Sequence, residues 1–320
     1  MRTGRYATPV RRVLVTCLLL AACSSKATPV AVPVARPVAS PSSQLPAGVR
    51  SVHVGGTPCG IAEATGAAWV TDAATATLFR VDPATMRAEK RAALDATPCE
   101  LTYAFGALWI ATQSGWLDRV DPAGGAVRRV KVGATSYEVE PAAGALWVSD
   151  RDSAELTRVD PTTLATSRFP LPGSRPGGLV SAFGYLWVGD DSDTSTAVLR
   201  VDPVRRTVTR VAADRRPAYT TATSTAVWVS DTAAGAVSRI DPRTLRAATV
   251  QVGVSPVNLD VVGDRVWVPD DQADAVYELD ASGAVARTVQ APGGGPAVVA
   301  PVGGRAWVSL YKTGEVWQIS

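Results

Sequence analysis

Residues 144–161 read GALWVSDRDSAELTRVDP, and this segment contains both landmarks of a repeat that runs through most of the chain. The first landmark is a tryptophan between aliphatic residues, Leu146-Trp147-Val148, and the second is Arg158-Val159-Asp160-Pro161. Equivalent tryptophans, 38 to 41 residues apart, are Trp69, Trp109, Trp147, Trp187, Trp228, Trp267 and Trp307. The chain of 320 residues therefore contains seven copies of one unit.

Each copy is expected to form short β-strands joined by tight turns. The runs around the tryptophans are rich in β-branched and aromatic residues, which is typical of strands. An Asp-Pro pair favours a turn, because the carboxylate accepts a nearby backbone N–H and proline fixes the next φ. A period near 40 residues without a helical pattern predicts an all-β, seven-bladed β-propeller with four-stranded antiparallel blades.

The two ends of the repeat array predict how the ring closes. The last copy stops at Trp317–Ser320 and lacks a fourth strand, whereas Val49–Val54 precedes the first copy and matches the fourth strands of other copies. We expect the N-terminal strand to join the last blade, because that pairing removes the exposed strand edges of an open array.

The repeats resemble the YVTN and streptogramin-lyase-like (virginiamycin B lyase-like) superfamily of seven-bladed propellers over residues 50–320. The resemblance rests on the Gly-x-x-Trp-Val strand and on a proline near the start of each blade, which Ser136 replaces in the third. These prolines are Pro58, Pro98, Pro176, Pro217, Pro256 and Pro296. The superfamily includes enzymes and non-enzymes, so the resemblance alone implies the fold and leaves the activity open.

The N-terminal segment has the pattern of an export signal. Residues 1–22 combine four arginines with a short apolar run, which predicts a signal peptide. Leu20-Ala21-Ala22-Cys23 resembles the lipobox of bacterial lipoproteins, which implies lipidation at Cys23. The alternative is an ordinary signal peptide cut after Ala22. We expect residues 23–48, rich in Ala, Pro and Ser, to be a disordered tether and residues 49–320 to form the propeller.

Charge excludes nucleic acid as an expected partner. The formal net charge of +3 comes from 32 basic and 29 acidic residues, and residues 1–22 hold four of the arginines and no acid. A mature chain without them is close to neutral, so no basic face is implied. We expect an extracytoplasmic protein, held on the bacterial cell membrane by its lipid.

Catalysis has little support in the residues. Similarity to the lyases of this superfamily would imply a catalytic site at the channel mouth, made of a histidine, a second histidine or acid, and a divalent metal. The only histidine here is His53, which falls in the predicted outermost strand, away from the channel. The alternative of a metal-dependent lyase or hydrolase would need a metal held by carboxylates such as Glu138 and Glu140. We expect no cofactor, with a divalent cation in the channel as the open alternative.

Alternation along the innermost strands predicts which side chains face the channel. Polar residues occur seven and nine positions before the tryptophans, and the candidates for a binding site at the channel mouth are Glu100, Glu138, Glu140, Tyr219, Asn258 and Asp260. Converging carboxylates raise one another's pKa and suit a cation or a basic ligand. The alternative is a water-filled channel lined by solvated acids.

The loops between the second and third strands are also acidic. They lie on one face of the propeller, here called the loop face, and their candidate binding residues are Asp190, Asp191, Asp193, Asp270 and Asp271. An aspartate three residues after the tryptophan recurs in five copies, which favours a turn role for Asp190 and Asp270. We expect nearby arginines to neutralise part of this charge, namely Arg175, Arg215 and Arg216.

Two cysteines fall inside the propeller, Cys59 and Cys99, each ten residues before its tryptophan. Equivalent positions on neighbouring innermost strands lie about 6 Å apart on a ring of roughly 7 Å radius, within reach of a disulfide. Because such pairs oxidise outside the cytoplasm, we expect a disulfide, with two buried thiols as the alternative.

Together these observations predict a monomeric, non-catalytic lipoprotein of the cell envelope. Its propeller would bind a protein, peptide, glycan or cation on the loop face.

Overall fold

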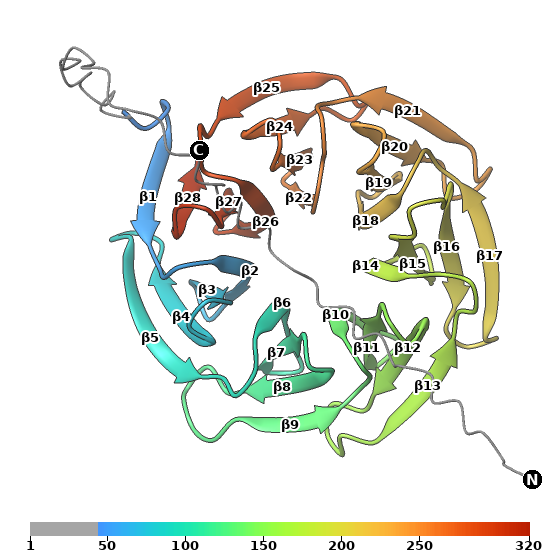
Figure 1. Ribbon diagram of the computed structural model, residues 1–320, viewed down its shortest axis with the longest axis horizontal. Coiled ribbons are helices and arrows are strands. Elements are labelled where there is room, and N and C mark those ends of the chain that lie inside the picture. Colours follow the sequence, from blue (N-terminus) through green and yellow to red (C-terminus); the bar gives the residue numbers. More distant parts are fainter. Residues whose placement is uncertain (1–43) are drawn as a thin grey trace, which may run out of the picture. The chain divides into compact units, whose positions relative to one another are not determined.

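A computed structural model describes residues 44–320 as seven β-sheets arranged in a ring (Figure 1). Each sheet has four antiparallel strands, and residues 44–320 contain no helix. The predicted seven-bladed β-propeller is therefore confirmed. The predicted signal peptide, Cys23 and most of the tether lie outside the described residues. Within the described part, no helix is long and apolar enough to cross a membrane.

The 28 strands repeat the same order from the channel to the rim of each blade. The innermost strands are β2 (Pro58–Ala64), β6 (Pro98–Ala104), β10 (Ser136–Ala142), β14 (Pro176–Ala182), β18 (Pro217–Ala222), β22 (Asp260–Val262) and β26 (Pro296–Val302). The second strands are β3 (Ala67–Asp72), β7 (Ala107–Thr112), β11 (Ala145–Asp150), β15 (Tyr185–Asp190), β19 (Val227–Asp231), β23 (Arg265–Asp270) and β27 (Arg305–Leu310).

The two outer layers complete the blades. The third strands are β4 (Thr77–Asp82), β8 (Trp116–Val120), β12 (Glu155–Val159), β16 (Ala197–Asp202), β20 (Ala236–Ile240), β24 (Ala275–Leu279) and β28 (Glu315–Ile319). The outermost strands are β5 (Arg87–Ala93), β9 (Arg128–Lys131), β13 (Thr166–Pro170), β17 (Thr207–Ala212), β21 (Ala247–Gln251), β25 (Val285–Gln290) and, in the last blade, β1 (Val49–His53).

The N-terminal strand closes the ring, as the ends of the repeat array predict. β1 pairs antiparallel with β28, from Val49 opposite Ile319 to His53 opposite Glu315. Arg50 reinforces the seam, because its Nη1 donates a hydrogen bond to Gln318 Oε1 at 3.2 Å. The last blade is thus built from both ends of the propeller, and its third strand has no free edge.

The repeated tryptophans are the main packing element between blades. Trp69 of β3 packs against Leu101, Leu108 and Ile110 of the second blade. Its indole Nε1 donates a hydrogen bond to Ala64 O at 3.0 Å, at the turn between the first two strands of its own blade. Each of the seven tryptophans is buried. One side chain therefore joins two blades and also fixes the turn beside it.

The recurring aspartates hold turns. Asp160 Oδ1 accepts backbone hydrogen bonds from Thr162 at 3.0 Å and Thr163 at 2.8 Å, so the Asp-Pro pair forms the predicted turn. The aspartate after the tryptophan acts on the loop face. Asp150 is fully buried and accepts backbone N–H groups of Ala134, Thr135, Asp152 and Ser153. It thereby ties the loop before β10 to the loop after β11.

Candidate functional site

Two cavities lie along the innermost strands. The larger, of about 400 Å³, extends toward the turns between the first and second strands, and we call it the hairpin-face cavity. The smaller, of about 320 Å³, lies where the innermost strands begin, and we call it the loop-face cavity. Glu100, Asn258 and Val298 line both cavities, so these three residues mark the level at which the cavities meet.

The six residues predicted for the channel mouth are divided between these cavities. Glu138, Glu140 and Asp260 line only the hairpin-face cavity, and Tyr219 lines only the loop-face cavity. The structure therefore brings the four carboxylates to the hairpin-face cavity inside the channel, and of the four only Glu100 also reaches the loop-face cavity. The alternation along the innermost strands predicts the channel-facing side chains correctly and misses the depth at which they lie.

Tyr219 contacts Tyr137, a residue that the sequence analysis does not single out. The two hydroxyl groups form a hydrogen bond, and the ring centroids are 6.0 Å apart. Gly178 of the intervening blade makes room, because a Cβ atom there would lie only 2.8 Å from Tyr219 Cα. Gly60 holds the same position in the first blade without a tyrosine pair beside it, so the glycine alone does not predict the contact.

The four carboxylates differ in how they are bound. Glu140 Oε1 accepts the backbone N–H of Ser181 at 2.9 Å. Asp260 Oδ1 accepts the Thr221 hydroxyl at 3.2 Å and the backbone N–H of Val261 at 2.7 Å. Glu100 is only 8% exposed, and its carboxyl group has no hydrogen-bond partner among residues 44–320. An acid without a protein partner at this depth is costly unless it is protonated or meets water or a ligand.

Burial raises the pKa of all four acids. The pKa of Glu100 rises to about 8, chiefly through burial and then through the charge of Asp260. Burial also raises the pKa of Glu140 to about 7 and that of Asp260 to about 6. For Glu138, burial together with Glu100 and Glu140 raises the pKa well above its usual value. The cluster thus retains protons near neutral pH and would release them to solvent when a cation binds.

The hairpin-face cavity suits an organic cation better than a metal ion. Neither lysine nor arginine lines it, so the acids have no internal counter-charge. Within the described residues, no three His, Cys, Asp or Glu side chains lie close enough together to hold a metal ion. These carboxylates can instead surround an organic cation that donates several N–H hydrogen bonds, such as an ammonium group. His53 lies on β1, the outermost strand of the last blade, away from both cavities.

The loop face is less acidic than the sequence suggests. Asp190 and Asp270 are buried and accept backbone N–H groups of their own loops, as their spacing from the tryptophans predicts. Asp191 is also buried. Asp271 is half-buried, and its pKa is raised by burial and by Asp270. Of the five predicted aspartates, only Asp193 is fully accessible.

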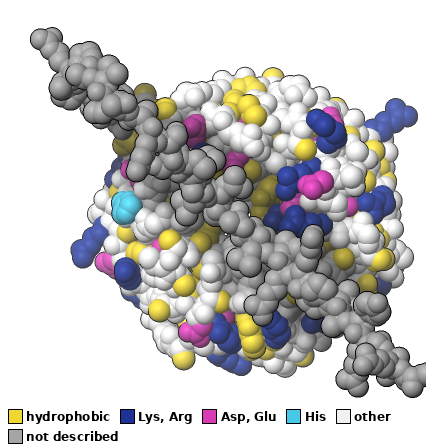
Figure 2. All heavy atoms as spheres, in the orientation of Figure 1, with side chains coloured by type: hydrophobic (Ala, Val, Ile, Leu, Met, Phe, Trp, Pro, Cys, Tyr) yellow, Lys and Arg dark blue, Asp and Glu magenta, His cyan; other side chains and the backbone are white. Residues whose placement is uncertain are grey.

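Asp191 is surrounded by arginines, only some of which match the expectation. Arg175 and Arg216 form ion pairs with it, as expected, at 3.1 and 2.7 Å. Arg151, which the sequence analysis does not single out, forms a third at 2.7 Å. Arg215 instead donates to the carbonyl oxygen of Ala233 at 3.0 Å. On the face seen in Figure 2, basic side chains gather beside the centre together with acidic ones.

The two cysteines are adjacent but are free thiols, so the expected disulfide is not present in the structure. Cys59 Sγ lies 3.4 Å from Pro98 O and 3.3 Å from Thr71 Oγ1, and both cysteines line the loop-face cavity. The thiol of Cys59 is therefore directed to hydrogen-bond acceptors instead of to the other sulfur. Burial raises the pKa of Cys59 to about 11 and that of Cys99 to about 12, which disfavours the reactive thiolate.

Comparisons with known proteins identify the fold. No family model and no curated protein matches the sequence. Among solved structures, virginiamycin B lyase from Staphylococcus aureus is 14% identical, with a TM-score of 0.75 over 85% of this chain and 98% of that one. The WD40 β-propeller domain of Doa1 is 9% identical, with a TM-score of 0.73 over 87% and 96% of the two chains. BamB from Moraxella catarrhalis is 14% identical, with a TM-score of 0.59 over 82% of each chain.

Identities this low establish a shared architecture and carry no information on the chemistry. The resemblance read from the repeats is thus confirmed for the fold: this chain has the β-propeller fold of virginiamycin B lyase.

Proposed function

We propose that this protein is a non-catalytic binding module of the cell envelope, anchored by a lipid at Cys23, whose channel accepts a protonated amine. The observation that carries the proposal is the carboxyl group of Glu100, which is nearly buried in an acidic cavity and has no partner among the described residues. A primary ammonium group supplies three N–H donors and one positive charge, which are what this cavity lacks.

The size and chemistry of the hairpin-face cavity define the ligand class. Its volume of about 400 Å³ matches a small organic group, and aliphatic walls from Leu101, Val139 and Leu259 accompany the acids. A lysine side chain of a peptide or an amino sugar of a glycan combines an apolar stem or ring with one ammonium group. The ligand would approach from the face that carries the turns between first and second strands, opposite the loop face.

The experiment compares amines with uncharged counterparts of the same shape. Calorimetric titration of the purified protein with Nα-acetyl-lysine amide and glucosamine, and with Nα,Nε-diacetyl-lysine amide and N-acetylglucosamine as their uncharged counterparts, measures the contribution of the charge. We expect only the amines to bind. Affinity should increase between about pH 6 and pH 8, because the acids must release protons to pair with the ligand.

Variants locate the site. Glu138→Gln removes a carboxylate of the hairpin-face cavity and should weaken amine binding by about tenfold. Glu89→Gln on the outermost strand β5 is the matched control and should bind as the wild type does. Equal binding of amines and their acetylated forms, or equal loss in both variants, would reject the proposal.

A further inference from the structure

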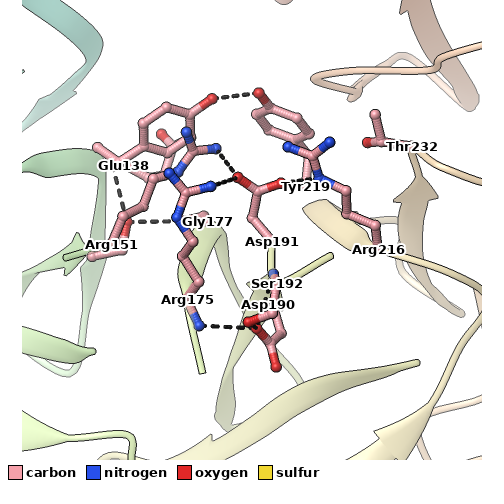
Figure 3. A network of polar contacts seen from close by, with 12 residues as sticks. Glu138, Arg151, Arg175, Gly177, Asp190, Asp191, Ser192, Arg216, Tyr219 and Thr232 are labelled. Carbon is pink, nitrogen blue, oxygen red and sulfur yellow. Dashed lines mark hydrogen bonds and ion pairs between the residues drawn. The ribbon is translucent and has the colours of Figure 1, made fainter. Parts of the chain in front are cut away.

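Three arginines from adjacent blades converge on one buried aspartate at the loop face (Figure 3). Arg151 follows β11, Arg175 precedes β14 and Arg216 precedes β18. Their nitrogen atoms lie 2.7, 3.1 and 2.7 Å from the carboxylate oxygens of Asp191, in that order. We call Arg151, Arg175 and Arg216 the arginine cluster.

The arginine cluster carries more positive charge than its surroundings neutralise. Asp191 balances one of the three guanidinium groups, which are always protonated. Asp193 approaches Arg216 at 3.9 Å but is 90% exposed, so water screens most of its charge. The buried Asp190 is engaged by a different arginine, Arg210, at 3.0 Å. Even if Asp193 neutralises a full charge, at least one of the three guanidinium groups therefore has no carboxylate to balance it.

Several donors of the cluster have no acceptor among residues 44–320. Arg151 Nε is buried and unpartnered, and Asp191 engages only one nitrogen of each arginine. The side chains of Arg175 and Arg216 remain 44% and 34% exposed. A single carboxylate would be satisfied by one arginine that binds it through two nitrogens, so the second and third arginines exceed what Asp191 requires.

The cluster is also held in place before any ligand arrives. The guanidinium carbon of Arg151 lies 3.5 Å from the ring centroid of Tyr137, which is itself hydrogen-bonded to Tyr219. Asp191 holds Arg175 and Arg216 through ion pairs. Its backbone N–H also donates a hydrogen bond to Arg175 O at 2.8 Å. Preorganised donors lose little entropy when an anion binds.

The geometry points to an oxyanion site at the loop face, in which Arg151, Arg175 and Arg216 bind the carboxylate or phosphate group of a ligand. Both groups present two or more oxygen atoms in the spacing that a guanidinium fork matches. This site lies on the face opposite to the turns through which the hairpin-face cavity opens, so it is independent of the amine proposed for that cavity.

Calorimetric titration with sodium phosphate, and separately with citrate as the carboxylate source, tests the site at a constant ionic strength maintained with sodium chloride. We expect the wild-type protein to bind at least one of them, and Arg216→Gln to weaken that binding by about tenfold or more. The matched control is Arg205→Gln, because Arg205 forms its ion pair with Asp202 in the outer turn after β16. This control should bind as the wild type does.

Two further variants separate binding from a purely structural role. Arg175→Gln changes a side chain that is 44% exposed, so it should retain the wild-type unfolding temperature and still lose affinity. Asp191→Asn removes the competing carboxylate and should tighten the binding of the anion. The inference is overturned if neither anion binds more tightly than chloride, or if Arg175→Gln and Arg216→Gln bind as well as Arg205→Gln.

Discussion

The hydroxyl groups of Tyr137 in the third blade and Tyr219 in the fifth blade are hydrogen-bonded to each other. The contact spans the start of the fourth blade, where Gly177 and Gly178 lie. The contact lies beside the loop-face cavity, and Arg151 stacks on the Tyr137 ring. The pair therefore links the third and fifth blades across the fourth, and Tyr137 also packs against Arg151 of the arginine cluster.

Removing one hydroxyl group tests this link. Tyr219→Phe leaves the Tyr137 hydroxyl without its partner and should lower the free energy of unfolding by about 1 kcal/mol. Tyr103→Phe, at an exposed tyrosine of β6, is the control and should change it little. Chemical denaturation of both variants gives the comparison, and equal stability of the two would contradict a structural role for the pair.

The buried acids predict a stability that falls with rising pH. The pKa of Glu100 is about 8 in the folded protein, chiefly because of burial, against a usual value of 4.5. Between these values the folded state keeps a proton that the unfolded state has lost, so the free energy of unfolding decreases as pH rises. Glu100→Gln should gain about 4 kcal/mol over wild type at pH 8 and almost nothing at pH 4, measured by urea denaturation.

The same measurement has a clear negative outcome. If wild type and Glu100→Gln differ equally at both pH values, the Glu100 carboxyl group does not titrate in this window.

Closure of the ring depends on β1. A chain without residues 49–53 should expose the edge of β28, melt at a lower temperature and aggregate at lower concentration. A chain that lacks only residues 24–43 keeps β1 and serves as the control. Differential scanning calorimetry and light scattering measure the two effects, and identical melting of the two chains would mean that β1 is dispensable.

The cysteines should behave as protected thiols. Because burial raises their pKa to about 11 and 12, Cys59 and Cys99 should react slowly with iodoacetamide at pH 8 in the folded protein and fully after denaturation. Peptide mass spectrometry without reductant measures both states. A cross-linked pair of peptides containing Cys59 and Cys99 would show that the disulfide expected from their spacing forms after all.

The lipid anchor is tested in the bacterial host. Cys23→Ser should abolish incorporation of labelled fatty acid and move the protein from the detergent phase to the aqueous phase. Cys17→Ser is a matched control, because Cys17 lies within the predicted signal peptide and should not be the lipidated residue. Label in the Cys23→Ser variant would reject the anchor.

The repeat makes most of this fold predictable. The spacing of Trp69 and its equivalents defines seven units, and the unmatched strand at Val49 defines the closure, since both follow from local strand and turn preferences. The channel-facing positions of Glu138 and Glu140 follow from the two-residue period of a strand.

The depth and partners of the site residues do not follow from the repeat. The contact of Tyr137 with Tyr219 and the convergence of Arg151 on Asp191 join different blades through long side chains. Tyr137 occupies the position that Cys59 and Cys99 hold in their blades, so alignment alone gives no reason to single it out. Such contacts depend on the curvature of the ring and on small residues such as Gly178.

The seam between β1 and β28 also has a consequence for the order of events during synthesis. Arg50 and Gln318, which are hydrogen-bonded across it, are 268 positions apart, so β1 leaves the ribosome long before its partner exists. Whatever blades form earlier, the last one cannot be completed until the C-terminus has been made. Ring formation is therefore a late event that requires the whole polypeptide, and a chain truncated anywhere before β28 leaves β1 with an unpaired edge.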